Sequence, residues 1–338
     1  MLHVRVLWLR PSTGENVSVR RERIAEHLEV WGVDVTIRDT SGFDSIGAFK
    51  EALFGDYDII AGNVRVGLYL GYPLARILRK PFLGDVSDPL SDIKGLPAPL
   101  YKALSWYEWF VLRHSDAAVF VYESSFEEAA SRGIDGVRLP NAVNYDSFAD
   151  PSKDVVNESR QILEDMDVNL NSRIAIYTGI LDDVHHITDI VESARSNQGW
   201  EYVFVGEGPI ESEVSAASNE LPNVHYLGSF EHRLMPGFLY HADAGFCFKD
   251  AEQTLKLKEY AAAGLPTLVQ PGELEKWYDD DELLFVDPDA KRISFTLDKL
   301  GNDECLKRHS ENISQAVDAM TWEDIAKKYY QIFKKINM

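Results

Sequence analysis

Strand-like apolar runs alternate with helix-like stretches through the first half of this chain, and this alternation limits the fold more than any other feature. Short runs rich in Val, Leu, Ile and Phe predict buried strands at 4–9, 33–37, 58–61, 81–84 and 117–121. Helices are predicted between them, at 17–31, 45–54, 66–79, 97–114 and 124–132. Strands that alternate with helices form a mostly parallel sheet with helices on both faces. The first half is therefore predicted to be a doubly wound α/β domain.

The alternation begins again after a polar connection at 144–172. Strands are predicted at 174–177, 202–205, 224–227, 244–248 and 267–269, and an amphipathic helix at 322–336. Since a domain averages roughly 150 residues, we divide the chain into domains at 1–150 and 151–320 and a final helix at 321–338. Ligands of doubly wound sheets bind at the carboxyl ends of the strands, so we expect the site in the cleft between the domains.

The chain is strongly acidic, with 34 Lys and Arg against 55 Asp and Glu and a formal net charge of −21. A nucleic-acid binder needs a basic face, so this balance argues against nucleic acid as a partner. Residues 1–150 hold 16 basic and 21 acidic side chains, whereas residues 151–338 hold 18 and 34. Such acidity is typical of a very salty cytoplasm, as in halophilic archaea, and also of ordinary acidic soluble proteins. Both interpretations stay open.

Neither a membrane span nor a cysteine framework is visible. The chain opens on a strand-like pattern rather than a signal segment, and its apolar stretches are shorter than the ~20 residues of a membrane helix. Cys247 and Cys305 lie too far apart in sequence to indicate a disulfide framework or a metal site. We therefore expect a cytoplasmic protein without a bound metal.

Five different short motifs follow one another along the chain in a characteristic order and spacing. They are Leu139–Phe148 (LPNAVNYDSF), Phe204–Pro209 (FVGEGP), Asn223–Gly228 (NVHYLG), Lys256–Pro266 (KLKEYAAAGLP) and Trp322–Ala326 (WEDIA). Together they resemble the group 1 glycosyltransferases of the GT-B fold, a family of retaining, nucleotide-sugar-dependent enzymes. The resemblance implies two Rossmann-like α/β domains that face a cleft, with the C-terminal helix crossing back to the first domain. It also implies that the first domain binds the acceptor and the second the donor.

The resemblance places several donor-binding residues in the second domain. Gly179, Gly206 and Glu207 would lie in loops close to the nucleotide sugar. Glu259 matches the family carboxylate that binds the ribose hydroxyls; alternatively, it is a solvated carboxylate at the start of a helix. Glu252, seven residues earlier where the commoner spacing is eight, is a catalytic candidate and shares that role with Asp250.

The segment after the predicted strand at 174–177 departs from the family. The family often has an Arg and a Lys that grip the diphosphate there, whereas this chain has Ile180 and His185 at those positions. A neutral imidazole donates one hydrogen bond and carries full charge only when protonated. Lys256 is therefore expected to take over part of the diphosphate binding. The alternative is that His185 and His186 form a surface turn.

The first domain offers weaker candidates. Gly14 lies in a loop that would allow a close backbone approach to donor phosphate or acceptor, or it belongs to a plain connection between strand and helix. The family's catalytic histidine is not visible, because Ser87 stands in its place. Asp85 and Asp88 are the catalytic candidates there, to orient the acceptor hydroxyl or to stabilise the cationic sugar. Otherwise they cap the next turn.

Two surface features of the first domain have two interpretations each. Arg20, Arg21 and Arg23 meet an acceptor phosphate or an anionic membrane, or they pair with Glu22, Glu26 and Glu29 on a solvated helix; we favour the second. The aromatic residues of 97–114 cover more than one helix face. They form either a surface for a membrane interface or lipid acceptor, or core packing between the halves.

The sequence thus predicts a retaining glycosyltransferase of cell-surface glycan or glycoprotein-glycan assembly. Its donor would be a nucleotide-diphosphate sugar, with no further cofactor, and its acceptor a saccharide or a polyprenyl- or dolichyl-linked saccharide. We expect it in the cytoplasm, with peripheral contact to the inner face of the membrane. The alternatives are a non-hydrolysing nucleotide-sugar epimerase and, because the family's Arg, Lys and His are missing, a non-catalytic sugar-nucleotide-binding partner of another transferase.

Overall fold

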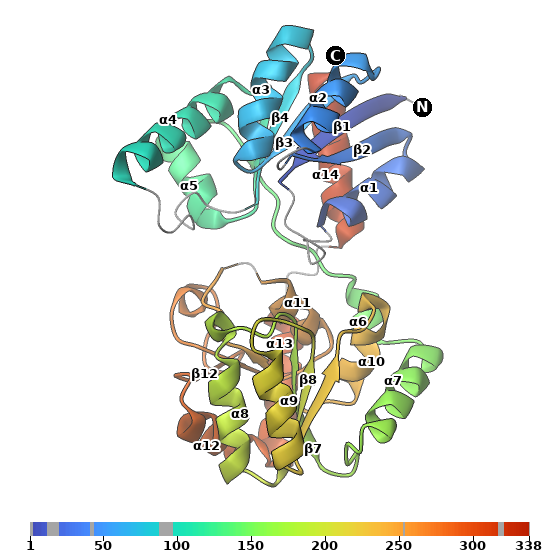
Figure 1. Ribbon diagram of the computed structural model, residues 1–338, viewed down its shortest axis with the longest axis vertical. Coiled ribbons are helices and arrows are strands. Elements are labelled where there is room, and N and C mark those ends of the chain that lie inside the picture. The colour runs from blue at the N-terminus through green and yellow to red at the C-terminus, as the bar shows by residue number, and fades with distance from the viewer. Residues whose placement is uncertain are drawn as a thin grey trace. The chain divides into compact units, whose positions relative to one another are not determined.

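The computed structural model describes residues 3–11, 20–40, 44–87, 97–252, 254–316 and 321–337. The chain divides into two compact units, drawn in Figure 1. The first comprises Met1–Ala142 together with Met320–Met338, and the second comprises Val143–Ala319.

Six parallel strands form the sheet of the first unit, in the order β2-β1-β3-β4-β5-β6. The strands are β1 (Val4–Arg10), β2 (Val33–Asp39), β3 (Ile59–Asn63), β4 (Phe82–Val86), β5 (Ala117–Phe120) and β6 (Val137–Arg138). The helices are α1 (Arg20–Val30), α2 (Asp44–Phe54), α3 (Val66–Leu78), α4 (Ala98–His114), α5 (Glu123–Ser131) and α14 (Trp322–Ile336). The order reverses direction at β1, as expected for a doubly wound sheet.

The last helix, α14, belongs to the core of the first unit. Its buried residues recur at helical spacing and form one apolar stripe, which packs against α1 and the sheet. Tyr329 and Phe333 lie on this stripe, with ring centroids 5.2 and 6.3 Å from that of the fully buried Trp8 of β1. Residues at the two ends of the sequence therefore share one core.

The second unit repeats the plan with the strand order β12-β11-β10-β7-β8-β9, all parallel. Its strands are β7 (Arg173–Thr178), β8 (Trp200–Val205), β9 (Val224–Gly228), β10 (Ala244–Cys247), β11 (Thr267–Val269) and β12 (Leu284–Phe285). Its helices are α6 (Tyr145–Ala149), α7 (Lys153–Asp165), α8 (Ile187–Ser196), α9 (Glu211–Glu220), α10 (Met235–Tyr240), α11 (Leu255–Ala262), α12 (Ala290–Leu300) and α13 (Asp303–Ala316).

The polar connection predicted at 144–172 contains two helices, α6 and α7. The mainly polar surface of α7 hid it in the sequence, because few of its residues are buried. Phe148 of α6 packs into the core of the second unit, so the structural division falls between Ala142 and Val143 rather than at 150.

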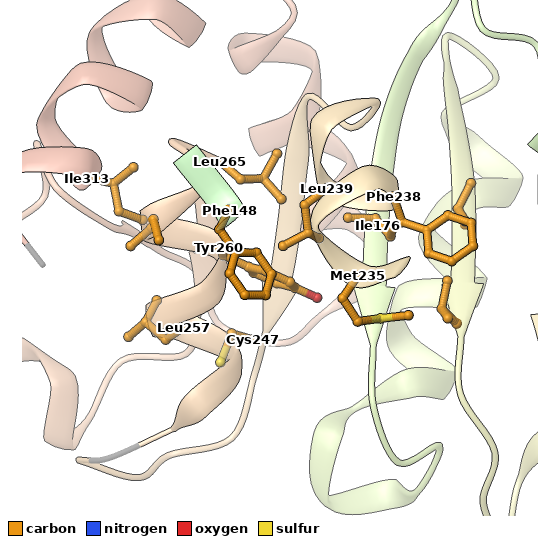
Figure 2. Packing of buried hydrophobic residues seen from close by; sticks show 14 of the residues in the cluster. Phe148, Ile176, Met235, Phe238, Leu239, Cys247, Leu257, Tyr260, Leu265 and Ile313 are labelled. Atoms are coloured by element: carbon orange, nitrogen blue, oxygen red, sulfur yellow. The ribbon is translucent and has the colours of Figure 1, made fainter. Parts of the chain in front are cut away.

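Buried side chains on one side of the second sheet fix α11 in place. Figure 2 shows Leu257 and Tyr260 of α11 packed with Phe238, Met235 and other apolar residues. Tyr260 is fully buried, and its hydroxyl accepts a hydrogen bond from the backbone N–H of Thr178 at 2.9 Å. This bond ties α11 to the carboxyl end of β7.

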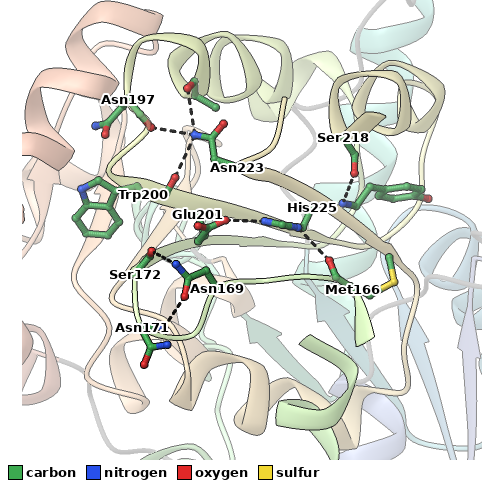
Figure 3. A network of polar contacts seen from close by, with 12 residues as sticks. Met166, Asn169, Asn171, Ser172, Asn197, Trp200, Glu201, Ser218, Asn223 and His225 are labelled. Atoms are coloured by element: carbon green, nitrogen blue, oxygen red, sulfur yellow. Dashed lines mark hydrogen bonds and ion pairs between the residues drawn. The ribbon is translucent and has the colours of Figure 1, made fainter. Parts of the chain in front are cut away.

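A polar network holds the edge of the same sheet (Figure 3). The side-chain amide of Asn223 donates to the backbone carbonyls of Ala194, Asn197 and Trp200 at 3.0–3.2 Å. His225 bridges the Glu201 carboxylate and the backbone carbonyl of Met166. Buried polar groups with partners cost little, so this edge is a firm support for the loops at the strand ends.

Candidate functional site

The candidate site lies where the second sheet reverses its strand order, at the carboxyl ends of β7 and β10. Gly179 follows β7 directly, and α11 follows β10 after a short loop. Ligands of open α/β sheets bind at such a reversal point. The described residues contain no group of three metal-ligating side chains.

Two glycine loops close the ends of β7 and β8 against each other. The backbone N–H of Gly179 donates to the carbonyl of Val205 at 2.8 Å. Gly206 has a φ of +144°, and a Cβ on it would lie 1.9 Å from the carbonyl oxygen of Gly179. Only glycine fits at 206, because both the dihedral angle and the space exclude a side chain. Gly179 itself is exposed, so its backbone is open to a ligand. Glu207 is exposed on the neighbouring loop.

Lys256, in the first turn of α11, supplies a buried cation without a counter-charge in contact. Its stem is partly exposed, but Nζ is buried and has no hydrogen-bond partner among the described residues. Nζ lies 3.5 Å from the centroid of the Tyr177 ring and 3.3 Å from the position of a Cβ on Gly179. Burial lowers the pKa of Lys256 to about 8. An unpaired buried charge is costly, so this position is suited to an anionic ligand.

His185 also contacts the Tyr177 ring, edge to face, with 5.9 Å between the ring centroids. Its Nδ1 is 2.6 Å from a carboxylate oxygen of Asp182, which also accepts the backbone N–H of His185. Burial and then the charge of Lys256 lower the pKa of His185, while Asp182 opposes them. His185 is mostly buried, whereas His186 sits in a left-handed turn beside Asp189.

The beginning of α11 adds backbone donors near this cation. Thr254 precedes the helix, but its side chain does not cap the first turn. Its hydroxyl lies instead 3.6 Å from the sulfur of Cys247. Backbone N–H groups of a first helical turn have no intrahelical partner and attract anions.

Glu259 and its neighbours complete the surroundings. A Glu259 carboxylate oxygen lies 2.7 Å from Nε2 of His232, and only 15% of its side chain is exposed, so it is not a freely solvated carboxylate. Glu252 is partly exposed in the loop between β10 and α11. Asp250 accepts the backbone N–H of Glu273 at 2.7 Å, so its carboxylate supports the turn before the 3₁₀ helix at Glu273–Lys276.

In the first unit, the prediction of a solvated arginine helix is wrong for two of the three arginines. Arg20 and Arg21 are buried, and only Arg23 pairs along the helix, with Glu26 at 3.1 Å. Arg20 donates to the backbone carbonyls of Leu139 and Pro140 at 2.8 Å each. This burial was not detectable from local sequence, because the covering helix α14 lies about 300 residues further along the chain.

Asp85 of β4 is fully buried near these arginines. Burial raises its pKa, and the charges of Arg20 and Arg21 oppose that rise. Neither of its carboxylate oxygens has a hydrogen-bond partner among the described residues. Asp85 therefore does not cap a surface turn. The other first-domain candidates, Gly14 and Asp88, lie outside the described residues.

Sequence reasoning missed three contact residues of the second unit: Tyr177, Asp182 and His232. Asp182 was detectable, because it stands three residues before His185, a spacing that brings side chains together in a helical turn. Tyr177 ends an apolar strand and is indistinguishable from a core residue. His232 meets Glu259 only through the tertiary fold.

Comparison with known proteins identifies the class of fold. No protein-family model and no curated protein sequence matches the chain. Solved structures do match, over nearly the whole chain. HepE from Anabaena, solved with UDP-glucose, is 13% identical with a TM-score of 0.75 and covers 98% of this chain and 100% of its own.

Sucrose-phosphate synthase from Thermosynechococcus elongatus is 17% identical with a TM-score of 0.72, over 98% of both chains. WaaG, a glycosyltransferase involved in lipopolysaccharide biosynthesis, is 12% identical with a TM-score of 0.67, over 97% of this chain and 99% of its own. The predicted fold class, two Rossmann-like doubly wound α/β domains of the GT-B type, is confirmed.

Proposed function

We propose that this chain is a glycosyltransferase that moves a sugar, with retention, from a nucleotide-diphosphate donor to a saccharide or a polyprenyl- or dolichyl-linked acceptor. One observation carries the proposal: Lys256 holds a buried cation at the reversal point of the second sheet, and its Nζ has no hydrogen-bond partner in the described part of the chain. A sugar nucleotide brings the anion that this position lacks. HepE, which shares the fold, was solved with UDP-glucose.

The transfer breaks the bond between the anomeric carbon of the sugar and a phosphate oxygen. Negative charge then grows on the leaving diphosphate, and groups already aimed at that charge lower the barrier. Lys256 and the first-turn N–H groups of α11 would bind the diphosphate, with His185 as a further donor. Gly179 and Gly206 would admit the phosphates close to the backbone, with Glu207 on the adjacent loop.

Glu259 would bind the ribose hydroxyls, with its orientation set by His232. Glu252 remains the proposed catalytic carboxylate near the sugar. In the first unit, Asp88 would contact the acceptor, and Asp85 would act indirectly by holding Arg20 and Arg21. A retaining route can use the leaving phosphate itself as the base, so it does not require the missing histidine. The work of the enzyme would be glycan assembly at the inner face of a membrane.

The test is calorimetry with UDP, GDP, ADP and dTDP and their sugars on wild type and two variants. Lys256→Met should weaken the best ligand about 100-fold, the effect of losing a charge-assisted contact in a buried site. Lys299→Met is the matched control, because Lys299 also lies over an aromatic ring, that of Phe295, on the surface helix α12. Equal affinity of both variants would remove Lys256 from the donor site.

Product analysis separates the remaining functions. A transferase forms a glycosylated product only when an acceptor, such as a cell-envelope lipid extract, is added. An epimerase converts the sugar nucleotide without any acceptor. A binding partner shows the Lys256-dependent affinity and no product. The exposed Ile180, where the family has its arginine, is the observation that favours this last outcome.

A further inference from the structure

A pocket of about 460 Å³ opens on the outer side of α4 in the first unit. Its walls combine aromatic rings with cationic side chains, among them Lys102, Trp106, Trp109, Phe110, Arg113 and Arg132. The pocket belongs to neither sheet end, so the proposed transfer does not use it.

The two faces of α4 differ sharply. Glu108, Val111 and Leu112 are buried beneath the helix. Lys102, Trp106, Phe110 and Arg113 follow one another at steps of four, four and three residues, which places them on one outer stripe. Trp106 is 68% exposed and stacks on Phe110 at 5.6 Å. A large ring left in water beside another ring indicates a binding surface rather than a core.

The cations of the pocket are held by backbone and ring contacts. The Arg132 guanidinium lies 4.7 Å from the centroid of the Trp109 ring and also pairs with Glu128. Arg113 donates to the backbone carbonyl of Arg132 at 2.6 Å. These contacts fix the guanidinium groups without cancelling the charge of Arg113.

The surface of α3 and α4 is basic, although the whole chain is acidic and α5 carries the exposed Glu127 and Glu128. Within residues 66–87 and 97–114, the acidic residues are Asp85 and Glu108, and both are buried. The basic residues of these stretches are Arg76, Arg79, Lys80, Lys102 and Arg113. Arg76 forms an ion pair with Asp116 at 3.3 Å. A surface that is basic in a chain of net charge −21 fits an anionic partner.

The neighbouring helices extend the apolar part of this surface. Helix α2 packs on α3, and α3 packs on α4 (Figure 1). Phe49 and Phe54 of α2 are 49% and 85% exposed, and Leu70 and Ile77 of α3 are 44% and 71% exposed. In the described part of the chain, no helix is long and apolar enough to cross a bilayer. Aromatic and basic side chains on adjacent helices are what an interfacial surface requires.

We propose that the outer side of α2, α3 and α4 docks on a bilayer containing anionic phospholipid, and that the α4 pocket takes one lipid phosphate headgroup. The basic side chains would bind the phosphate, while Trp106 and the exposed residues of α2 and α3 enter the headgroup region. The inference rests on the proposed function in one respect, since a lipid-linked acceptor gives a transferase a reason to reach the bilayer.

The test is sedimentation with vesicles of equal parts phosphatidylglycerol and phosphatidylcholine, and with phosphatidylcholine alone, at low and high salt. The wild type should bind the anionic vesicles at low salt and not the neutral ones. The double variant Lys102→Glu/Trp106→Ala should bind them about tenfold more weakly. The matched control in the second unit is Lys291→Glu/Trp277→Ala, with Trp277 47% exposed, and should bind as the wild type does.

Three outcomes would overturn the docking proposal: no binding by the wild type, equal loss in both double variants, or equal binding to neutral vesicles. Release from the vesicles by inorganic phosphate would show that the pocket takes free phosphate instead. Thermal unfolding checks that the exposed substitutions leave the fold intact. UDP binding, measured on the same samples, separates the two proposals, because its absence counts against the donor site and not against docking.

Discussion

Each unit buries cationic side chains beside its sheet, but the counter-charges of the described residues lie differently around them. In the first unit, Arg20 and Arg21 lie close to the buried carboxylate of Asp85. In the second, the Nζ of Lys256 has no hydrogen-bond partner among the described residues and rests on the ring of Tyr177. The first unit therefore holds an internally neutralised cluster. In the second, Glu259 and Asp182 act on Lys256 from a distance, but no carboxylate of the described residues contacts its Nζ.

The comparison shows how to separate structural from ligand-binding charge. A cation with an internal counter-ion stabilises the fold, and its removal leaves the partner unpaired. A buried cation without one costs free energy in the ligand-free state, so it persists for another reason, such as a ligand. The two parts of the chain also differ in net charge. Residues 151–338 carry 34 acidic side chains, so a general electrostatic attraction of anions cannot explain how the one proposed anion site binds its donor.

The largest effect should come from breaking the cluster of the first unit. Arg20→Met removes the donor to the carbonyls of Leu139 and Pro140 and leaves Asp85 with Arg21 alone. We expect the free energy of unfolding to fall by about 3–5 kcal/mol in urea denaturation. Arg23→Met, which removes only the exposed pair with Glu26, should stay within about 0.5 kcal/mol of the wild type. Similar losses in both variants would contradict the internal neutralisation.

In the second unit, removal of the buried cation is expected to increase the free energy of unfolding instead of lowering it. Burial lowers the pKa of Lys256 to about 8, so the folded chain bears the cost of its charge at neutral pH. Lys256→Met should raise the free energy of unfolding by about 1–3 kcal/mol at about pH 7. The gain should shrink as the pH rises from about 8 towards 10.5, because the neutral lysine costs nothing. A destabilised Lys256→Met variant would show that the cation has an internal role.

A smaller effect, on the pH dependence of donor affinity, should distinguish the contribution of His185 from that of Lys256. Burial and the charge of Lys256 lower the pKa of His185, so its imidazole is neutral in the free chain near pH 7. A bound diphosphate favours the protonated ring, so the affinity for UDP-glucose should rise roughly three- to tenfold between about pH 7 and 5.5.

Asp182→Asn removes the carboxylate that raises the pKa of His185, and should reduce this acid-side gain. Asp189→Asn is the control, because Asp189 faces His186 instead. If the acid-side gain is unchanged in Asp182→Asn, His185 does not take up a proton when the donor binds.

Most of the fold was predictable because hydrophobic periodicity and the turn residues that end helices and strands are local sequence signals. The two strand–helix series gave both doubly wound sheets and, through Trp322–Ile336, the final helix. β6 and β12 escaped prediction because two residues carry no periodic signal. The helices α6 and α7 lie in a stretch whose polar sequence predicts a connection, since most of the residues of α7 are polar and few are buried.

The sequence motifs proposed members of the candidate site but could not indicate how their charges are paired. The motif Lys256–Pro266 pointed to Lys256 and Glu259, and the structure places their side chains beside Tyr177 and His232. Whether a lysine is paired depends on which segments fold against it, and these come from β7 and the loop after β9. The same reason hid the burial of Arg20 and Arg21, which depends on α14.

The most direct test of the account is the pKa of Lys256, followed by NMR of its ε-CH₂ group in the free protein and with UDP. We predict a pKa near 8 in the free protein and a clear rise when UDP binds. The rise follows because an anion beside a cation favours its charged form. An ordinary pKa in the free protein, or no change with bound UDP, would contradict the claim that Lys256 awaits an external anion.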